Sequence, residues 1–148
     1  MSKVGVVQMR SGRDMASNLV DAEALVREAA AKGAGYVLTP EVSNIFEPDK
    51  DRLKVVAMRQ DDDIFVKRFL ELAKELGIYL HAGSLALNAG QEKLANRSML
   101  FGPEGALLTT YDKIHLFDID LPNGESYRES ATYNPGANAV TAQLPDFK

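Results

Sequence analysis

Hydrophobic and polar residues follow a strand–helix–strand pattern at the start of the chain. Short, nearly continuous apolar runs at 4–9 and 36–38 each predict a buried strand, the first of them covered on both faces. Between them, apolar residues recur at the spacing of one helix face: Met15, Leu19, Ala22, Val26 and Ala29. Asp14 is placed to cap this helix and Gly33 to end it. The pattern predicts a βαβ-like unit with parallel strands.

The next segment predicts helices and then strands. A short helix is expected at 53–58, and a longer one after the acidic residues 61–63, ending at Gly77. The apolar stripe of the longer helix is Phe65, Phe69, Leu72 and Leu76. Three successive strands are then expected, at 78–87, 94–101 and 106–111.

Regular patterning fails in two segments. Residues 42–50 are irregular, and residues 112–136 show little periodicity before a weak last strand near 139–144. Long loops inside a compact domain are usually functional or disordered. We therefore look for chemistry in these segments.

Composition limits the class of protein. The 148 residues suggest one domain, and 45% apolar with 26% charged residues is ordinary for a soluble globular chain. The net charge of −4, without a basic stripe, argues against nucleic acid as a partner. No apolar run has the length of a membrane span, and Met1 is followed by a strand-like segment rather than a signal-peptide core. We expect a cytoplasmic protein with no membrane partner.

The sequence contains no cysteine, which removes disulfides, thiolate metal sites and a cysteine nucleophile from these residues. The two histidines, His81 and His115, lack metal-ligand spacing, so we expect no metal site. His81 lies in an apolar strand and is predicted to be a core histidine satisfied by hydrogen bonds. Nucleotide-binding and serine-hydrolase motifs are also missing.

Two charged residues follow predicted strands. Glu41 comes after the strand at 36–38, at the edge where open α/β sheets place their sites, although a solvated or capping carboxylate fits the same position. Lys113 lies in a run of ionisable and apolar residues, and its ammonium could stabilise an oxyanion. The alternative is a surface lysine paired with Asp112 or Asp118.

A third polar segment, 123–130, carries Glu125 and Glu129 four residues apart. If this segment were helical, the two carboxylates would share a face, and repulsion would favour protonation of one of them. That would suit acid/base chemistry. A solvated loop is the simpler interpretation.

Together these motifs resemble the front half of the nitrilase superfamily, the carbon-nitrogen hydrolases. The resemblance extends over nearly the whole chain, and its motifs are the segments 4–9, 36–41, 95–98, 101–105, 111–118, 129–130 and 135–136. The runs 113–118 and 123–126 are most similar to the branch of small-amide hydrolases that includes ω-amidase and deaminated glutathione amidase. The resemblance implies an α/β fold, the N-terminal part of an α-β-β-α sandwich of two sheets between helices.

The resemblance also implies an amidase mechanism based on a Glu, a Lys and a Cys. Glu41 would be the general base, Lys113 would stabilise the tetrahedral oxyanion, and Glu129 would position substrate or support the lysine. The cysteine would attack a small amide and form a thioester. No metal or organic cofactor is required.

The sequence departs from this family pattern because it contains no cysteine. In relatives the cysteine lies on a strand shortly after the region that ends here at 144–148, so we expect residues 1–148 to be the N-terminal portion of one carbon-nitrogen hydrolase domain, inactive alone. Uncovered strand edges and an apolar sheet face would then favour a homo-oligomer or a complementary C-terminal half as partner. The alternative is a non-catalytic protein that binds a small amide or carboxylate, or pairs with a relative.

Overall fold

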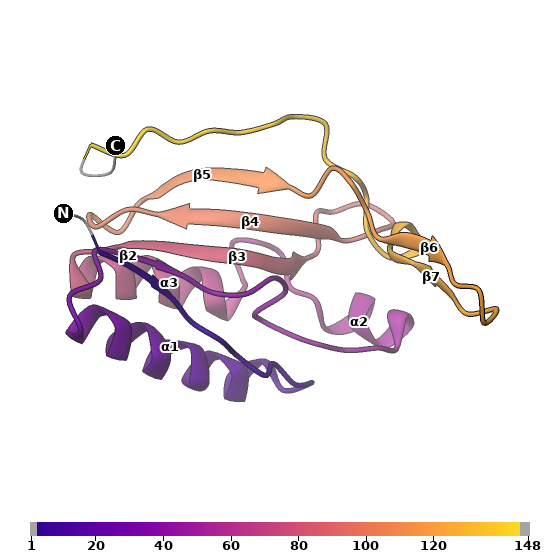
Figure 1. Cartoon of the computed structure of the whole chain (residues 1–148), viewed down its shortest axis with the longest axis horizontal. Coiled ribbons are helices and arrows are strands. Elements are labelled where there is room, and N and C mark those ends of the chain that lie inside the picture. Colours follow the sequence, from indigo (N-terminus) through magenta and orange to yellow (C-terminus); the bar gives the residue numbers. More distant parts are fainter. Residues whose placement is uncertain (1–2, 146–148) are drawn as a thin grey trace.

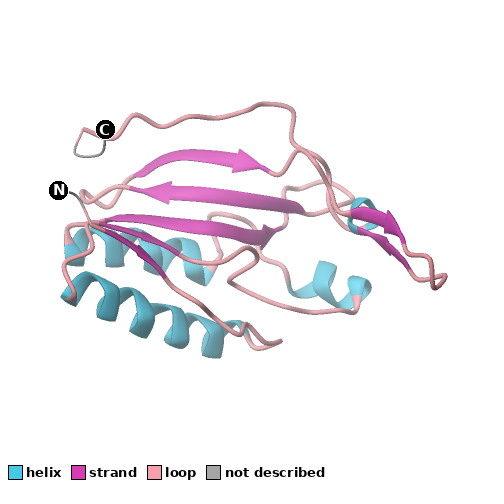
Figure 2. Cartoon of the chain, in the orientation of Figure 1, coloured by secondary structure: helices cyan, strands magenta, loops and turns pink. Residues whose placement is uncertain are grey.

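The computed structural model describes residues 3–145 and shows a five-stranded sheet with two long helices packed on one face (Figures 1 and 2). Expectations that concern residues 1–2 and 146–148 lie outside the described residues. The elements in chain order are β1 (Val4–Val6), α1 (Met15–Ala31), β2 (Tyr36–Leu38), α2 (Lys50–Val56), α3 (Ile64–Leu76), β3 (Tyr79–Leu87), β4 (Ala95–Phe101), β5 (Leu107–Asp112), β6 (Asp118–Asp120), β7 (Ser126–Arg128) and the 3₁₀ turn η1 (Glu129–Ala131).

The strand order across the sheet is β1-β2-β3-β4-β5. β1, β2 and β3 are parallel, with Gly5, Val37 and Leu80 side by side, which confirms the predicted βαβ unit. β4 is antiparallel to both β3 and β5. The first residues of β4 therefore lie at the same edge of the sheet as the last residues of β2, β3 and β5.

Both long helices begin and end where the sequence predicts. Asp14 caps α1, with its side chain accepting a hydrogen bond of 2.7 Å from the Ser17 amide, and Gly33 follows the helix with φ of 88°. Asp63 caps α3 in the same way, and Gly77 ends it in the left-handed conformation. These signals are local in the chain, so the sequence alone places them.

The core fills the space between the helices and the sheet. Phe69 is fully buried, with its ring centroid 5.4 Å from that of Phe65 and 6.1 Å from that of Phe101. The predicted stripes of α1 and α3 supply most of the helix side of this core, and the sheet side is Val37, Leu80, Ala82, Leu85, Leu87, Met99 and Phe101. Burial of these side chains is the main stabilising contribution of the fold.

The prediction that the first strand is covered on both faces is wrong. Gly5 and Val7 pack toward the helices, whereas Val4 and Val6 are 54% and 74% exposed on the other face. A Val-rich run looks the same whether one face or both are covered. The expectation of an apolar sheet face without cover is thus met at β1.

Three other expectations need correction. Residues 139–144 form no strand; they run as an extended segment past the sheet (Figure 1) and line a cavity of about 300 Å³ with Tyr36, His81 and neighbouring strand residues. The short helix α2 begins at Lys50 rather than at residue 53, because Asp49 caps it. The segment 112–136 contains the hairpin β6–β7 and η1, which are too short to show a hydrophobic period.

We call residues 113–134 the arm, because they leave the end of β5 and carry the projecting hairpin β6–β7 (Figure 1). All three residues of β6 and all three of β7 are exposed. Across the described range 3–145, no helix has the length and apolar character needed to cross a bilayer.

Candidate active site

Glu41 lies in a tight turn directly after β2. The turn is fixed by the buried Ser43, whose hydroxyl donates to the Pro40 carbonyl at 2.6 Å, and by the Val42 amide, which donates to Ser84. Val42 has φ of 50°, a left-handed conformation that is strained for a β-branched residue. Such strain persists only where the surrounding structure holds it, and it is concentrated at functional sites.

A glycine makes room for this turn. A Cβ at Gly83 would lie 2.2 Å from the backbone oxygen of Thr39, so β3 can approach the turn closely only without a side chain there. The same holds near the next site residue, where a Cβ at Gly136 would lie 2.1 Å from the Asp112 oxygen. Both glycines set the backbone that presents the charged side chains.

Lys113 and Glu129 come from opposite ends of the arm. The Lys113 amide donates to the Asn96 carbonyl at 3.0 Å, which continues the pairing of β4 with β5 by one residue. Glu129 begins η1, and its carboxylate accepts a hydrogen bond of 2.6 Å from the Phe117 amide. The arm therefore folds back and returns Glu129 to the position where it started.

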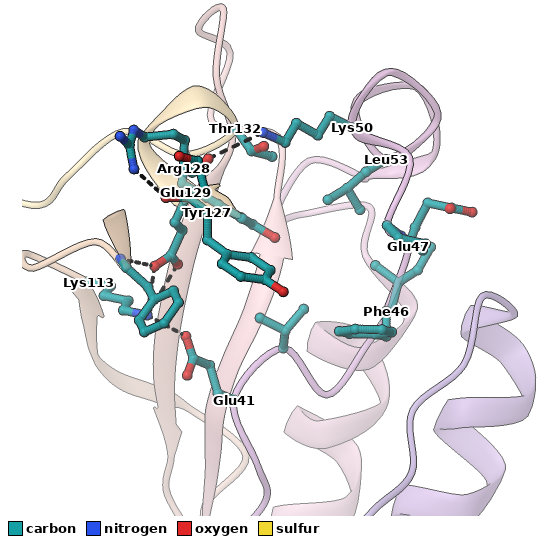
Figure 3. Close-up of a pocket in the computed structure, with 16 residues that line it drawn as sticks. Glu41, Phe46, Glu47, Lys50, Leu53, Lys113, Tyr127, Arg128, Glu129 and Thr132 are labelled. Carbon is teal, nitrogen blue, oxygen red and sulfur yellow. Dashed lines mark hydrogen bonds and ion pairs between the residues drawn. The ribbon is translucent and has the colours of Figure 1, made fainter. Parts of the chain in front are cut away.

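The three predicted site residues meet at one point (Figure 3). The Lys113 ammonium lies 2.8 Å from Glu41 Oε1 and 2.9 Å from Glu129 Oε2. Asn96, at the start of β4, donates from Nδ2 to Glu41 Oε1 at 2.7 Å and to Glu129 Oε1 at 3.1 Å. Two carboxylates are thus joined by one cation and one neutral amide.

The contacts favour the charged forms of Lys113 and Glu129. Burial by itself would lower the pKa of Lys113, but hydrogen bonds to Glu41 and Glu129 outweigh it and raise that pKa above its ordinary value. Burial likewise opposes ionisation of Glu129, yet the Phe117 amide, Lys113 and Asn96 hold its pKa below the usual range. Both shifts favour the charged forms, an ammonium on Lys113 and an ionised carboxylate on Glu129.

The cluster faces a cavity of about 590 Å³ between the turn after β2, α2 and the arm. Its lining is mainly apolar and aromatic, and comprises Val42, Ile45, Phe46, Pro48, Leu53, Phe117, Tyr127 and Tyr133 with the polar residues Glu41, Glu47, Lys50, Lys113, Ser126, Arg128, Glu129 and Thr132. A cavity with apolar walls and a few converging polar groups is typical of a small-molecule site.

Two features shape this cavity. Lys50 donates to the Arg128 carbonyl at 3.3 Å and so joins α2 to the arm (Figure 3). Tyr133 lies in the wall, where burial and the charges of Glu129 and Glu41 raise its pKa to about 12. Its hydroxyl therefore stays protonated as a neutral donor.

Glu47 holds the loop before α2. Its side chain is almost completely buried; Oε1 accepts from the Asp49 amide at 3.0 Å, and Oε2 lies 3.2 Å from Arg52 Nε. The Arg13 guanidinium lies 3.5 Å from Oε1. These contacts fix the loop that carries Phe46 and Lys50 to the cavity.

The alternative partners proposed for Lys113 are engaged elsewhere. Asp112 pairs with Arg97 at 2.7 Å, and Asp118 accepts hydrogen bonds from Ser130. Glu125 lies in the exposed turn before β7 and Glu129 in η1, so the conditional helical pair of these two carboxylates does not form.

The predicted hydrogen bonding of His81 is confirmed, but its place in the core is not, because the residue is only partly buried. Its ring nitrogens lie 2.5 Å from the Tyr36 hydroxyl and 2.7 Å from Ser98 Oγ. Burial lowers its pKa, which favours the neutral ring. His81 therefore has a structural environment of its own on the open face of the sheet.

Asn96 is the site residue that the sequence analysis did not assign. The signal was present. Asn96 and Ser98 are polar and lie two positions apart, on the same face of β4, and polar residues in a buried strand need hydrogen-bond partners. The rule that places sites at the carboxyl ends of strands passes over it, because β4 is antiparallel and brings its first residues to that edge.

The sequence profile described as "Carbon-nitrogen hydrolase" matches residues 3–147. The chain belongs to this family. Among curated proteins it is 36% identical to Omega-amidase NIT2 of Danio rerio over 152 aligned residues and 37% identical to Omega-amidase NIT2 of Mus musculus, in each case covering 99% of this chain and 52% of the relative. The chain therefore spans about half the length of these relatives.

Solved structures agree on the fold. The NitFhit protein of C. elegans superposes with a TM-score of 0.81 at 23% identity, over 95% of this chain and 35% of the other. Nit3 of Saccharomyces cerevisiae, described as a member of branch 10 of the nitrilase superfamily, gives 0.75 at 24% identity, over 94% and 50%. The family resemblance and the α/β fold expected from the sequence are confirmed.

Proposed function

We propose that the protein containing this chain hydrolyses small linear amides, with Glu41 as general base, Lys113 as oxyanion donor and Glu129 as the support of the lysine. The observation that carries the proposal is the Lys113 ammonium held 2.8 Å from Glu41 and 2.9 Å from Glu129 beside a cavity of small-molecule size. Family membership supports carbon–nitrogen bond hydrolysis.

The proposed chemistry needs a thiol that these 148 residues do not contain. Glu41 takes the thiol proton as sulfur bonds to the amide carbon, and Lys113 stabilises the oxyanion that forms on the carbonyl oxygen. The protonated Glu41 then gives its proton to the leaving nitrogen, the C–N bond breaks, and ammonia departs from a thioester. Glu41 next deprotonates water, which cleaves the thioester, and the proton returns to the thiolate.

Omega-amides of short dicarboxylates are the substrates we propose first, because the relatives with the ω-amidase name share more than a third of their aligned residues with this chain. No cofactor enters this mechanism. A homo-oligomer or a complementary C-terminal half as partner, the nucleophile on that half, and a cytoplasmic location stay predictions.

The second candidate function is binding without catalysis. It is favoured by the cavity and the Glu41–Lys113 pair, which could hold a small amide or carboxylate without any covalent step. Such a protein would bind a small amide or carboxylate, or pair with a relative. Direct binding of the amide without ammonia release, even after addition of the complementary half, would favour it.

Ammonia release tests the proposal. The 148-residue chain alone should release none from ω-amides, and the protein that also supplies the thiol should be active. In that protein Glu41→Gln should abolish turnover, and Lys113→Ala should reduce it by about 100-fold or more. Glu125→Gln, at the exposed tip of the hairpin, is the matched control and should be neutral. Robust hydrolysis by the isolated chain would overturn the thiol mechanism.

A further inference from the structure

We propose that Asn96 is a positioning residue that joins the two site carboxylates through a neutral bridge. This inference rests on the proposed function and deepens it. Asn96 contacts all three predicted site residues: its side chain donates to Glu41 and Glu129, and its backbone carbonyl accepts from the Lys113 amide. Lys113 links the same two carboxylates through its ammonium, so Asn96 is the uncharged one of the two bridges.

The environment of Asn96 makes this bridge rigid. The residue is only 2% exposed, and it is held in the ladder of β3, β4 and β5. Both hydrogens of its amide group are used, one for each carboxylate, at 2.7 and 3.1 Å. An amide without a partner at such a site would leave a buried polar group unsatisfied, so the side chain has one favourable orientation.

Asn96 contacts Glu41 and Glu129 but does not line the larger cavity. It lines a smaller cavity of about 220 Å³ together with Gly83, Ser84, Ser98 and Tyr111, whereas the larger cavity is lined by the carboxylates themselves. Glu41 and Lys113 line both. A substrate in the larger cavity would therefore touch Glu41 and Lys113, and Asn96 would act through them.

The Asn96 amide is uncharged, and this affects the carboxylates that it joins. Glu41 and Glu129 share one ammonium, Lys113, so one negative charge of the cluster is not balanced by it. A second cation in place of Asn96 would favour the ionised form of both carboxylates and oppose proton uptake by the base. An amide fixes the same oxygen atoms without that electrostatic effect.

Two substitutions at Asn96 separate position from charge. Asn96→Ser shortens the side chain, so that it no longer reaches Glu41 and Glu129. Asn96→Asp keeps the shape of the side chain but replaces its two amide donors with a third carboxylate. In the active protein both should lower kcat by about 10- to 100-fold, since small displacements of reacting groups have effects of that size, with KM changed by less than about threefold. Asn134→Asp, which alters a surface hydrogen bond to Gln91, is the matched control.

The pH profile distinguishes positioning from a structural role. The added charge of Asn96→Asp should move the acid limb of the kcat/KM profile to higher pH, whereas Asn96→Ser should leave the limb in place. If Asn96 were needed only for folding, both substitutions would reduce the amount of active protein and leave the acid limb of the kcat/KM profile where it is in the wild type. Wild-type kcat and limbs in both variants would overturn the inference and leave the proposed amidase function intact.

A titration of the chain itself tests the inference if no amide is hydrolysed. The groups that face Glu129 are Lys113, Glu41, Asn96 and the buried Tyr133. Carbon-13 NMR of the Glu129 carboxyl, assigned with Glu129→Gln, should show a higher pKa in Asn96→Asp than in the wild-type chain and in Asn134→Asp. An identical titration in all three would refute the bridge, independently of catalysis.

Discussion

The helix-covered side of the sheet and the arm differ in how their residues are held. Between sheet and helices, side chains such as Phe69 and Leu80 are fully buried and come from regular positions of long elements. In the arm, β6 and β7 are exposed throughout, and position depends on polar contacts such as Phe117 to Glu129. The first region provides stability, and the second brings distant charges together.

This difference teaches where strain and polarity are tolerated. The turn at Val42 and the arm meet at one edge of a sheet whose other parts are firmly packed. A firmly packed sheet can hold a few residues in strained backbone conformations, because the free energy of its packing exceeds the free energy of the strain. Three experiments test this division of roles, beginning with the largest effect.

Truncation of a core aromatic residue should give the largest difference between the two regions in the free energy of unfolding. Phe69→Ala removes a fully buried ring between Phe65 and Phe101 and should lower the free energy of unfolding by about 3–5 kcal/mol. Phe117→Ala, in the arm and 58% exposed, is the control and should change it by less than about 1 kcal/mol. Urea unfolding measures both. Equal losses would contradict the comparison.

Loss of the carboxylate that closes the arm should have a local effect. Glu129→Ala removes the acceptor of the Phe117 amide and one partner of Lys113. Hydrogen exchange of amides in 117–129 should become faster by about 10- to 100-fold, as expected for loss of hydrogen bonds to a charged group.

Amides of α3 provide the internal reference for this experiment. They should exchange at the wild-type rate, because the side-chain contacts of Glu129 are with Phe117, Lys113 and Asn96, whereas α3 packs in the helix-covered core. Ser126→Ala, at the hairpin, is the matched control and should leave the Glu129 contacts intact. Faster exchange throughout α3 would show that the arm and the body unfold together.

The smallest effect is expected in the ion network between α1 and α3. Hydrogen bonds from Arg68, with a further contribution from Arg27, overcome burial and lower the pKa of Glu23 to about 2. A carboxylate with a depressed pKa stabilises the fold above its unfolded value near 4.5 and loses that contribution as pH falls toward 2. Because the pair is partly solvated, we expect about 1 kcal/mol or less.

Thermal unfolding between pH 5 and pH 2.5 measures this contribution. Glu23→Gln should flatten the decrease in Tm on the acid side, and Glu104→Gln, in an exposed turn, should leave it unchanged. An unaltered pH profile in Glu23→Gln would show that the network contributes nothing measurable.

The sequence predicted the body well because its signals are local. Asp14 and Asp63 cap the helices that follow them, Gly77 ends one of them, and the apolar stripes have the helical period. The strands at 78–87, 94–101 and 106–111 were each predicted to within about a residue or two. Burial of β1 was predicted wrongly, because coverage of a strand depends on what packs against each face of the sheet, and a Val-rich run does not reveal it.

The site was predicted only in part. Glu41 and Lys113 were singled out because they follow predicted strands, and Glu129 because it lies in a polar segment; the family resemblance supplied their roles. The structure brings the three side chains together, and their catalytic roles stay predictions. Asn96 was left without a role because its position depends on the direction of β4. The hairpin β6–β7 was missed because its three-residue strands carry no measurable period.

By itself, the sequence determined the family, the helices, the central strands and the types of charged residue available for chemistry. These follow from interactions between residues close in the chain, and from motifs whose order is characteristic. The tertiary structure decided which carboxylates share Lys113, which amide joins them and which cavity they face. Those contacts unite residues up to 88 positions apart, from Glu41 to Glu129, and only the packed sheet fixes such distances.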